Sequence, residues 1–466
     1  MTQPPPSPSN QSDFTTPDAA LSSAQRADRL ALAFLAACGL LAAPLLFAAR
    51  LPQGLLLLVV AALVLVFSAR GLLTRSFLPA TAANWPNLLL LLVLPVGLWA
   101  STDVTASGPV IYKAVAGFAI FYGLAGLADA RWMRALPWLL VVVSAGLALV
   151  VLLGANWATA KVSFLPDTIY SLLPTVRLPW RPEGIHPNLA GSAMAWLLLP
   201  AAAMALWSRN RRLQGLAAVA AALLAVTLLL SQSRGAWLGA AVGLSVMPAL
   251  RYRRWWILLA AALAVALVVT LVVGPAQMAA ALFPASAAEE VTVNTLPGRL
   301  ELWTRALAML HDFGPSGAGP GQFEQVVMVL YPPFFTGLLG GFQHAHNQFL
   351  QMAVDFGVPG LVAFVALLIA LGAGMVAATW RWPAEDQPDA PLAALTAGIF
   401  GSLLALTIHG LVDAPIVAPR GYALLFALFG MAAAASQRLL TPAGEAAQQR
   451  DPSPPPAPAA PHSDGR

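Results

Sequence analysis

Charged residues and cysteine are both scarce in this sequence. Asp, Glu, Lys and Arg make up only 10% of the 466 residues, whereas apolar residues make up 59%. Soluble domains carry about 25% charged residues, so the composition excludes an ordinary soluble enzyme. The single cysteine, Cys38, lies within an apolar run, which excludes a disulfide framework and a thiolate metal site.

The apolar residues fall into blocks that are long enough to cross a bilayer, which takes about 20 residues of helix. Strands of alternating hydropathy are absent, and only helices or closed barrels can span lipid. The sequence therefore predicts an all-α, polytopic helical membrane protein with about 12 transmembrane helices. We expect these spans near residues 29–49, 53–69, 86–101, 110–128, 136–154, 188–207, 213–231, 235–250, 255–273, 357–379, 392–411 and 420–436. The eighth is short enough to be a tilted or partial span.

The basic residues indicate how the spans are oriented. Arg residues collect in alternate short loops, as at 131–134 and 251–254, and such loops are normally cytoplasmic. This distribution accounts for the net charge of +5 and gives no indication of a nucleic-acid partner. Residues 1–26 and 441–466 are then cytoplasmic tails, and their Pro- and Ser-rich composition predicts disorder. The transmembrane domain between the tails covers residues 27–440.

The largest segment outside the spans covers residues 274–356, between the ninth and tenth spans, on the periplasmic or extracellular side. Loops longer than about 12–15 residues are usually either functional or disordered. Because this loop is rich in aromatic residues, we expect it to pack against the bundle. Residues 297–310 predict a short amphipathic helix. The apolar residues that follow helical spacing there are Leu300, Trp303, Leu307 and Leu310.

Two arginines are expected where the chain meets the bilayer on that side. Arg234 lies in the turn Ser-Gln-Ser-Arg-Gly-Ala-Trp, where it can extend to lipid headgroups or form an anion site. Arg299 lies in the first turn of the amphipathic helix, where backbone N–H groups and the guanidinium can face one anion together. A solvated helix end is the alternative there. A guanidinium suits phosphate because its rigid fork of donors matches the phosphate oxygens.

Two histidines, His344 and His346, come just before the tenth span and are followed by Asn347. The pair could ligate a metal, but a third and fourth ligand are not evident nearby, and zinc helices favour a spacing of three or four. We therefore expect no metal and no other cofactor. A histidine suits general-base chemistry near neutral pH. Structural hydrogen bonding at the membrane surface is the alternative.

Three further features have simpler interpretations. A proline fits the first turn of the sixth span, where His186 or Asn188 is expected to act as a cap. His409 and Asp413 form a polar pair at the end of the eleventh span, which packing explains as well as function does. The Gly-rich segment 314–321 lacks the Gly-Lys-Ser/Thr ending of a P-loop, and it predicts a tight turn.

Taken in order along the chain, these motifs resemble the O-antigen ligase and polymerase superfamily. The motifs are His-Pro-Asn-x-x-Gly, Ser-Gln-Ser-Arg-Gly-Ala-Trp, Gly-Arg-x-x-x-Trp, Gly-x-Gly-Pro-Gly-x-Phe and His-Ala-His-Asn-x-x-Leu-Gln, within residues 180–365. The resemblance implies a glycosyltransferase that moves a glycan from a polyprenyl diphosphate donor to an acceptor hydroxyl. It also implies that neither a nucleotide sugar nor a metal takes part, and that the anomeric carbon is inverted.

The resemblance implies roles for individual residues. Arg234 and Arg299 would bind the donor diphosphate, and His346 or His344 would be the base. We favour His346 because Asn347 is its neighbour. Supporting roles would fall to Ser233, His186 and Asn188. The expected partners are the lipid-linked glycan donor, a glycan or lipid acceptor, and membrane lipid.

The acceptor stays open at this point. Within the superfamily, ligases use a sugar of the lipid A core, polymerases use another lipid-linked repeat, and protein O-oligosaccharyltransferases use a pilin Ser or Thr. A transporter or flippase with twelve spans is the alternative from another class. Such folds usually carry internal repeats and a midplane site. Here the sequence shows no two similar halves, and ionisable residues within the spans are nearly absent. Both features favour an enzyme at the membrane surface.

Overall fold

The computed structural model describes residues 23–157, 167–173, 176, 184–274, 277, 293, 295–334, 341–384, 386–417 and 421–441. These residues form α-helices joined by turns and short 3-10 helices. The predicted tails therefore lie almost wholly outside the described residues. The predicted loop 274–356 is described only in part.

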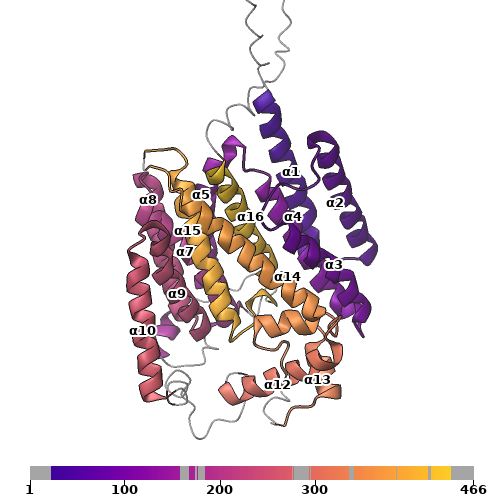
Figure 1. Ribbon diagram of the computed structural model, residues 1–466. Helices are drawn as coiled ribbons and strands as arrows, with labels where there is room; N and C mark the ends of the chain where they lie inside the picture. The colour runs from indigo at the N-terminus through magenta and orange to yellow at the C-terminus, as the bar shows by residue number, and fades with distance from the viewer. Residues whose placement is uncertain are drawn as a thin grey trace, which may run out of the picture.

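Each predicted span corresponds to one helix of the structure (Figure 1). These helices are α1 (Ser23–Leu46), α2 (Gln53–Thr74), α3 (Asn84–Ala100), α4 (Val104–Ala125), α5 (Leu136–Gly154), α7 (Pro187–Trp207), α8 (Arg211–Leu230), α9 (Arg234–Arg251), α10 (Trp255–Val273), α14 (Gln348–Thr379), α15 (Ala390–Gly410) and α16 (Gly421–Leu440). Among the described residues, 10 helices are long and apolar enough to cross a membrane. Helix α3 has only 17 residues, and α9, the short eighth block of the sequence, also falls below these limits. The chain is thus a multi-pass helical membrane protein.

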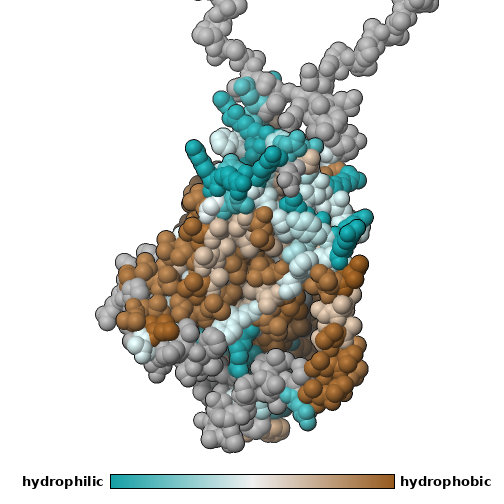
Figure 2. Space-filling view, turned by 90° about the vertical axis from the view of Figure 1, so that its left-hand side faces the viewer, coloured by the Kyte–Doolittle hydropathy of each residue, from teal (hydrophilic) through white to brown (hydrophobic). Residues whose placement is uncertain are grey.

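Three shorter helices complete the described chain: α6 (Asp167–Leu172), α12 (Leu296–Phe313) and α13 (Phe323–Leu330). Helices α12 and α13 lie at one end of the bundle, which we call the α12–α13 end, and α1 begins at the opposite end (Figure 1). Hydrophilic residues gather at that opposite end, and apolar residues form a broad band below them (Figure 2). Helix α10, at the edge of the bundle, has no buried residue, as expected for a helix surrounded by lipid.

Helices α9 and α15 pack closely because glycines line their contact. A β-carbon at Gly239 would lie 2.5 Å from the carbonyl oxygen of Ala405, and one at Gly243 would lie 2.7 Å from that of Gly401. Small residues let helix backbones approach in membranes, where apolar burial gives little drive for association. This packing brings the beginning of α9 to the end of α15.

Helix α14 begins nine residues earlier than the predicted tenth span, at Gln348 rather than residue 357. Gly357 interrupts the helix with φ 71°, so the segment before it is a separate short helix that sequence hydropathy did not reveal. The Gly-rich segment packs against this interruption and is a tight turn, as predicted. Its contacts include Val358 N to Gly314 O at 2.7 Å and Ala318 N to Val354 O at 2.8 Å.

The predicted amphipathic helix is present as α12, but its expected apolar stripe is not the buried one. Leu300 and Leu307 are exposed, whereas Leu302, Ala306 and Met309 are buried. The helix carries apolar residues on more than one face, and periodicity alone does not say which face meets the protein. Packing with α13 and α14 selects the buried face.

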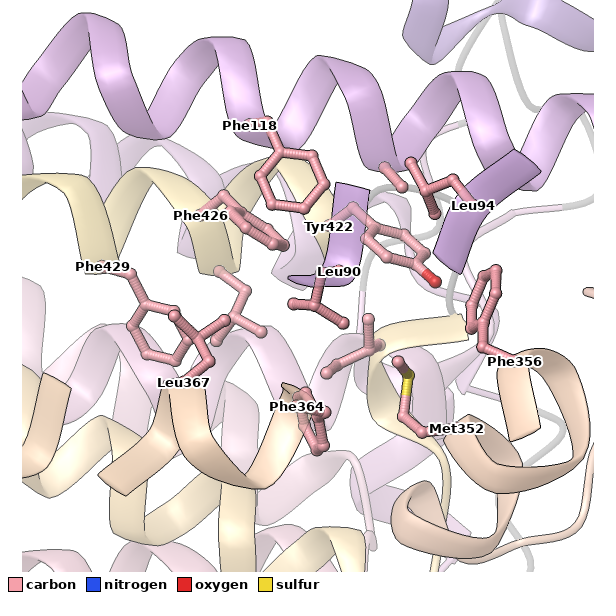
Figure 3. Close-up of a pocket in the computed structure, with 13 residues that line it drawn as sticks. Leu90, Leu94, Phe118, Met352, Phe356, Phe364, Leu367, Tyr422, Phe426 and Phe429 are labelled. Carbon is pink, nitrogen blue, oxygen red and sulfur yellow. The ribbon is translucent and has the colours of Figure 1, made fainter. Parts of the chain in front are cut away.

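A small apolar cavity lies within the bundle between α3, α4, α14 and α16 (Figure 3). Phe118, Phe356, Phe364 and Phe426 are among its lining residues, and the only lining hydroxyl is that of Tyr422. Because this lining offers almost no polar group, the cavity is not suited to bond-breaking chemistry. The polar side chains converge elsewhere, at the α12–α13 end.

Candidate functional site

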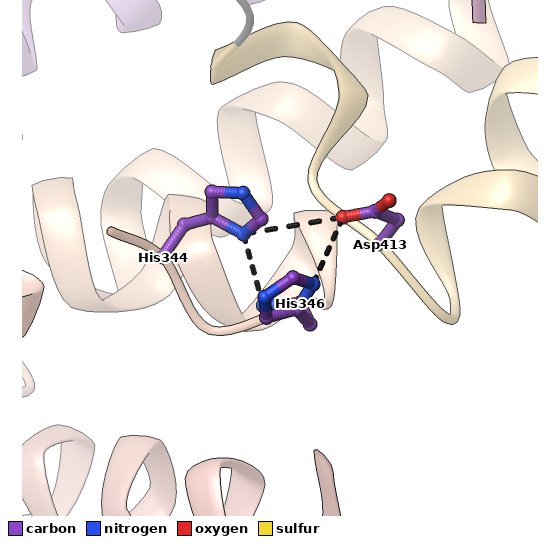
Figure 4. A group of neighbouring side chains, drawn as sticks. All are labelled: His344, His346 and Asp413. Atoms are coloured by element: carbon purple, nitrogen blue, oxygen red, sulfur yellow. Dashed lines mark hydrogen bonds and ion pairs between the residues drawn. The ribbon is translucent and has the colours of Figure 1, made fainter. Parts of the chain in front are cut away.

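The carboxylate of Asp413 is the centre of a cluster of histidines just beyond the end of α15. His346 Nδ1 lies 3.2 Å from Asp413 Oδ1, and His344 Nδ1 lies 4.0 Å from the same oxygen. The rings of His344 and His346 lie side by side and face this carboxylate (Figure 4). His409 Nε2 approaches the other oxygen at 3.7 Å. The polar pair His409 and Asp413, which packing could have explained, thus belongs to the same cluster as the predicted base.

Hydrogen bonding distinguishes the two candidate bases. The backbone N–H of His346 donates to His344 Nδ1 at 3.3 Å, so this nitrogen is an acceptor and neutral His344 carries its proton on Nε2. His346 Nδ1 can then donate to Asp413, which leaves Nε2 of His346 as the acceptor. A histidine held by a carboxylate through Nδ1, with Nε2 directed away, is the arrangement that general bases of hydrolases use.

The electrostatics of the cluster favour this assignment. Burial raises the pKa of Asp413, but hydrogen bonds from His346 and His409 outweigh it and hold the pKa well below its usual range. Burial lowers the pKa of His344 to about 4, the charge of His346 adds to the shift, and Asp413 opposes it. At neutral pH, Asp413 is therefore ionised and His344 is uncharged.

The turn that carries the histidines is held in an uncommon conformation. His346 has φ 49°, in the left-handed region that is costly for a residue with a side chain. Trp303 of α12 donates its Nε1–H to the carbonyl of His346 at 3.3 Å. Asn347 caps α14 by accepting from Phe349 N and Leu350 N, and its Nδ2 donates to Leu411 O at 3.1 Å. Asn347 thus ties the histidine turn to the segment that carries the carboxylate.

Arg299 reaches the same segment from the first turn of α12. Its Nη1 donates to Val412 O at 2.6 Å and its Nε donates to Val293 O at 3.2 Å. Burial lowers the pKa of Arg299, Asp413 opposes this shift, and the charge of Arg234 adds to it. Arg299 and Arg234, 65 positions apart in the sequence, both lie beside the segment that follows α15, because Gly235, next to Arg234, lies against His409 and Val412. Two neighbouring cations of this kind are a feature of anion sites.

Arg234 is exposed at the first position of α9, directly after Ser233. Ser233 is only 2% exposed, and its hydroxyl finds no hydrogen-bond partner among the described residues. Its side chain does not cap the helix either. A β-carbon at Gly235 would lie 2.6 Å from His409 Cδ2, so the start of α9 lies against the histidine cluster. An N-terminal helix turn with a buried, unpaired hydroxyl is suited to an anionic ligand.

The beginning of α7 lies against this turn. The helix starts at Pro187, as predicted, and His186 precedes it with its carbonyl accepting from Ala190 N at 3.2 Å. Asn188 is the second residue of the helix and not its cap, and its side chain lies outside the described residues. A β-carbon at Gly191 would lie 2.7 Å from Ser231 Oγ, so this close approach requires glycine.

The structure adds a third potential metal ligand that the sequence did not reveal. Ligand atoms of His344, His346 and Asp413 all lie within 4.8 Å of one another. One of these atoms, His344 Nδ1, already accepts a backbone hydrogen bond, which competes with metal coordination. The absence of a metal therefore stays a prediction.

The geometry is that of a membrane protein with two arginines and a carboxylate-held histidine meeting at one end of the bundle. A comparison with family models matches residues 219–365 to the family described as O-antigen ligase. This match, which covers part of the chain, confirms the resemblance of the motifs that lie within it and supports a membrane glycosyltransferase of the O-antigen ligase type. No curated protein matches the chain. The matched segment contains Arg234, Arg299, His344 and His346, and it ends before Asp413.

Proposed function

We propose that the protein transfers a glycan from a polyprenyl diphosphate donor to an acceptor hydroxyl on the outer face of the inner membrane. The observation that carries this proposal is the hydrogen bond between His346 and Asp413, formed beside Arg299, which donates to Val412 O, and beside the start of α9, which carries Arg234. Together, these residues would supply a base and an anion site within one group of contacts. The O-antigen ligase match supports the same class of reaction.

The donor diphosphate binds at Arg234, Arg299 and the beginning of α9. As the bond between the anomeric carbon and the phosphate oxygen breaks, negative charge grows on the departing diphosphate. Fixed cations stabilise this developing charge more than they stabilise the bound donor, which lowers the barrier. The Ser233 hydroxyl, buried without a protein partner among the described residues, donates to a phosphate oxygen.

His346 is the base. Its Nε2 takes the proton of the acceptor hydroxyl while the hydroxyl oxygen forms a bond to the anomeric carbon, and polyprenyl diphosphate leaves from the opposite side. Attack from the side opposite the leaving group inverts the anomeric carbon. Asp413 stabilises the resulting imidazolium, as the carboxylate does in hydrolase triads. The proton then passes to solvent, and this reaction needs no metal or cofactor.

The charge distribution supports the assignment of the faces. At the end opposite α12 and α13, Arg134 and Arg438 both pair with Asp389 at 3.1 Å, and Arg131 pairs with Asp28 at 3.3 Å. Basic residues in short loops mark the cytoplasmic side. The α12–α13 end then faces the periplasm or the exterior, where no nucleotide donor is present and lipid-linked donors are used.

The test of the donor site is loss of transfer in Arg234→Ala and in Arg299→Ala. Arg305→Ala is the matched control, because Arg305 lies on the same helix α12 and pairs with Glu301 at 2.6 Å. Each removal of a transition-state contact should lower kcat by about 100-fold or more. Normal transfer by Arg234→Ala or Arg299→Ala, with the protein inserted in the membrane, contradicts the diphosphate role.

The glycoconjugates that accumulate in a strain lacking the protein identify the acceptor substrate. Mass spectrometry that finds single lipid-linked repeats indicates a polymerase, and long lipid-linked chains indicate a ligase. Loss of a sugar from a protein Ser or Thr indicates a protein O-oligosaccharyltransferase. Glycan that is trapped on the cytoplasmic side would instead favour a transporter or flippase.

A further inference from the structure

Two buried polar side chains lie on α14, one helical turn apart, behind the turn that carries the histidines. Gln351 is 1% exposed and Asp355 is 3% exposed. Gln351 Oε1 accepts from the backbone N–H of Ala345 at 2.8 Å, and its Nε2 donates to Asp355 Oδ1 at 2.8 Å. The same oxygen of Asp355 accepts from Gly321 N at 3.3 Å. A continuous chain of hydrogen bonds therefore joins the Gly-rich turn to the residue between the two histidines.

The bonds leave the Gln351 amide only one orientation. Its oxygen must face the N–H of Ala345 and its nitrogen must face the carboxylate of Asp355, because a reversed amide would oppose like groups on both sides. The backbone N–H of Ala345 enforces this choice, because it can only donate. Buried polar groups that are fully paired in this way hold a single local structure.

The histidine turn needs such support because its conformation is strained. A left-handed non-glycine residue costs on the order of 1–3 kcal/mol and persists only where its surroundings fix it. His346 is that residue, at φ 49°, and the bond to Ala345 N lies directly before it. Without that bond, the turn can relax toward ordinary φ values and move Nε2 of His346 away from the acceptor hydroxyl.

We propose that Gln351 and Asp355 are positioning residues, which place the base His346 by holding the backbone of the histidine turn. This inference rests on the proposed function for its readout, since neither residue touches the donor or the acceptor. A misplacement of about 1 Å costs about 100-fold in rate when the reacting groups must align. The effect should appear in kcat and not in the KM for the donor, because the diphosphate is held by arginines on α9 and α12.

A double-mutant cycle tests the proposal. Gln351→Glu keeps an acceptor for Ala345 N but places a second carboxylate against Asp355, so kcat should fall by about 10- to 100-fold. Asp355→Asn keeps an oxygen that can accept from Gln351, so its loss should stay below about 5-fold. In the double variant, the new asparagine amide can donate to the new glutamate, with loss of the longer bond from Gly321 N at 3.3 Å. Its kcat should recover to within about 5-fold of the wild type, with the donor KM unchanged throughout.

The control is Gln322→Glu, which also places a carboxylate where a fully buried amide lies. Gln322 donates to Asp103 O at 3.2 Å and to Ser107 Oγ at 3.3 Å, and no described bond joins it to the histidine turn. It should lower the thermal unfolding midpoint but leave kcat within about 3-fold. Should Gln351→Glu fail to insert, the uncharged Gln351→Met removes both bonds and should show the same fall in kcat.

The outcomes separate this proposal from the proposed function. Transfer by the wild type together with a normal kcat in Gln351→Glu overturns the positioning role alone. An equal loss of kcat in Gln322→Glu, or no recovery in the double variant, also overturns it, because the loss is then general destabilisation. If the wild type itself shows no transfer with any lipid-linked donor, the proposed function fails instead.

Discussion

Replacing Asp413 with asparagine tests the central contact of the site. The Asp413 carboxylate accepts from His346 Nδ1 at 3.2 Å and from Ala414 N at 2.9 Å through the same oxygen. An amide is uncharged, so it stabilises the imidazolium less, and its NH₂ group can favour the wrong tautomer of His346. Hydrogen bonds to ionised groups contribute about 1.5–3 kcal/mol. That loss corresponds to a fall in kcat of about 10- to 160-fold.

Loss of the carboxylate cannot cost more than loss of the base that it orients, and removal of a general base lowers the rate by about 100- to 10,000-fold. We therefore expect Asp413→Asn to lower kcat by about 100-fold, and His346→Ala to lower it at least as much. The assay is the initial rate of glycan transfer by purified protein in detergent, with a lipid-linked donor. The thermal unfolding midpoint is measured in the same samples.

The chain offers a matched control on its surface. Asp312, at the end of α12, lies 2.8 Å from His311 Nδ1, so it forms the same kind of pair without lying in the site. Asp312→Asn should change kcat by less than about 2-fold. The reasoning is refuted if Asp413→Asn, folded and inserted, transfers glycan at the wild-type rate. An equal loss in both variants would show that the effect is not specific to the site.

The other predictions concern His344, the metal and the packing of α9. His344 is already neutral above about pH 4, so His344→Asn should keep the wild-type shape of the pH–rate profile between pH 5 and 8. Its lowered pKa also predicts that stability falls as the pH drops from about 6.5 toward about 4, and that His344→Asn weakens this fall in acid unfolding curves. Transfer should persist in EDTA, and its loss with recovery on adding a divalent cation would reverse the metal-free expectation. In Gly239→Ala the new β-carbon meets a backbone oxygen, so the variant should destabilise the folded protein by about 1–3 kcal/mol. Gly146→Ala is the control, because its β-carbon meets nothing within 4 Å. Equal unfolding midpoints of the two variants would contradict the close packing of α9.

The transmembrane helices are the part of the fold that hydropathy predicts well. Each predicted span coincides with a helix because crossing lipid demands a long apolar segment with its backbone bonds satisfied internally. Hydropathy did not reveal the short helix at the start of α14. This segment packs against the Gly-rich turn, and the break at Gly357 depends on that contact.

The candidate site was predicted in pieces and not as an arrangement. Arg234, Arg299 and His346 stand out because polar groups beside apolar spans are conspicuous. The role of Asp413 could not be read in this way, since a carboxylate four residues after His409 has an adequate explanation in local packing. One signal was overlooked. The spacing of Gly235, Gly239 and Gly243 predicts a helix face that approaches another helix closely, and that helix is the one that presents Asp413.

The position of Asp413 also bears on which part of the chain forms the functional unit. The segment that matches the O-antigen ligase family ends at residue 365, before α15 begins at Ala390. That segment supplies the arginines and the histidines, but the carboxylate that orients His346 comes from the end of α15. Contacts from three elements hold this end in place: Gly235 of α9 lies against His409, Arg299 of α12 donates to Val412 O, and Asn347 donates to Leu411 O. Under the proposed function, the base is oriented from outside the matched segment. The family motifs alone would then not complete the site, and the packing of α9 against α15 would be needed to place the carboxylate.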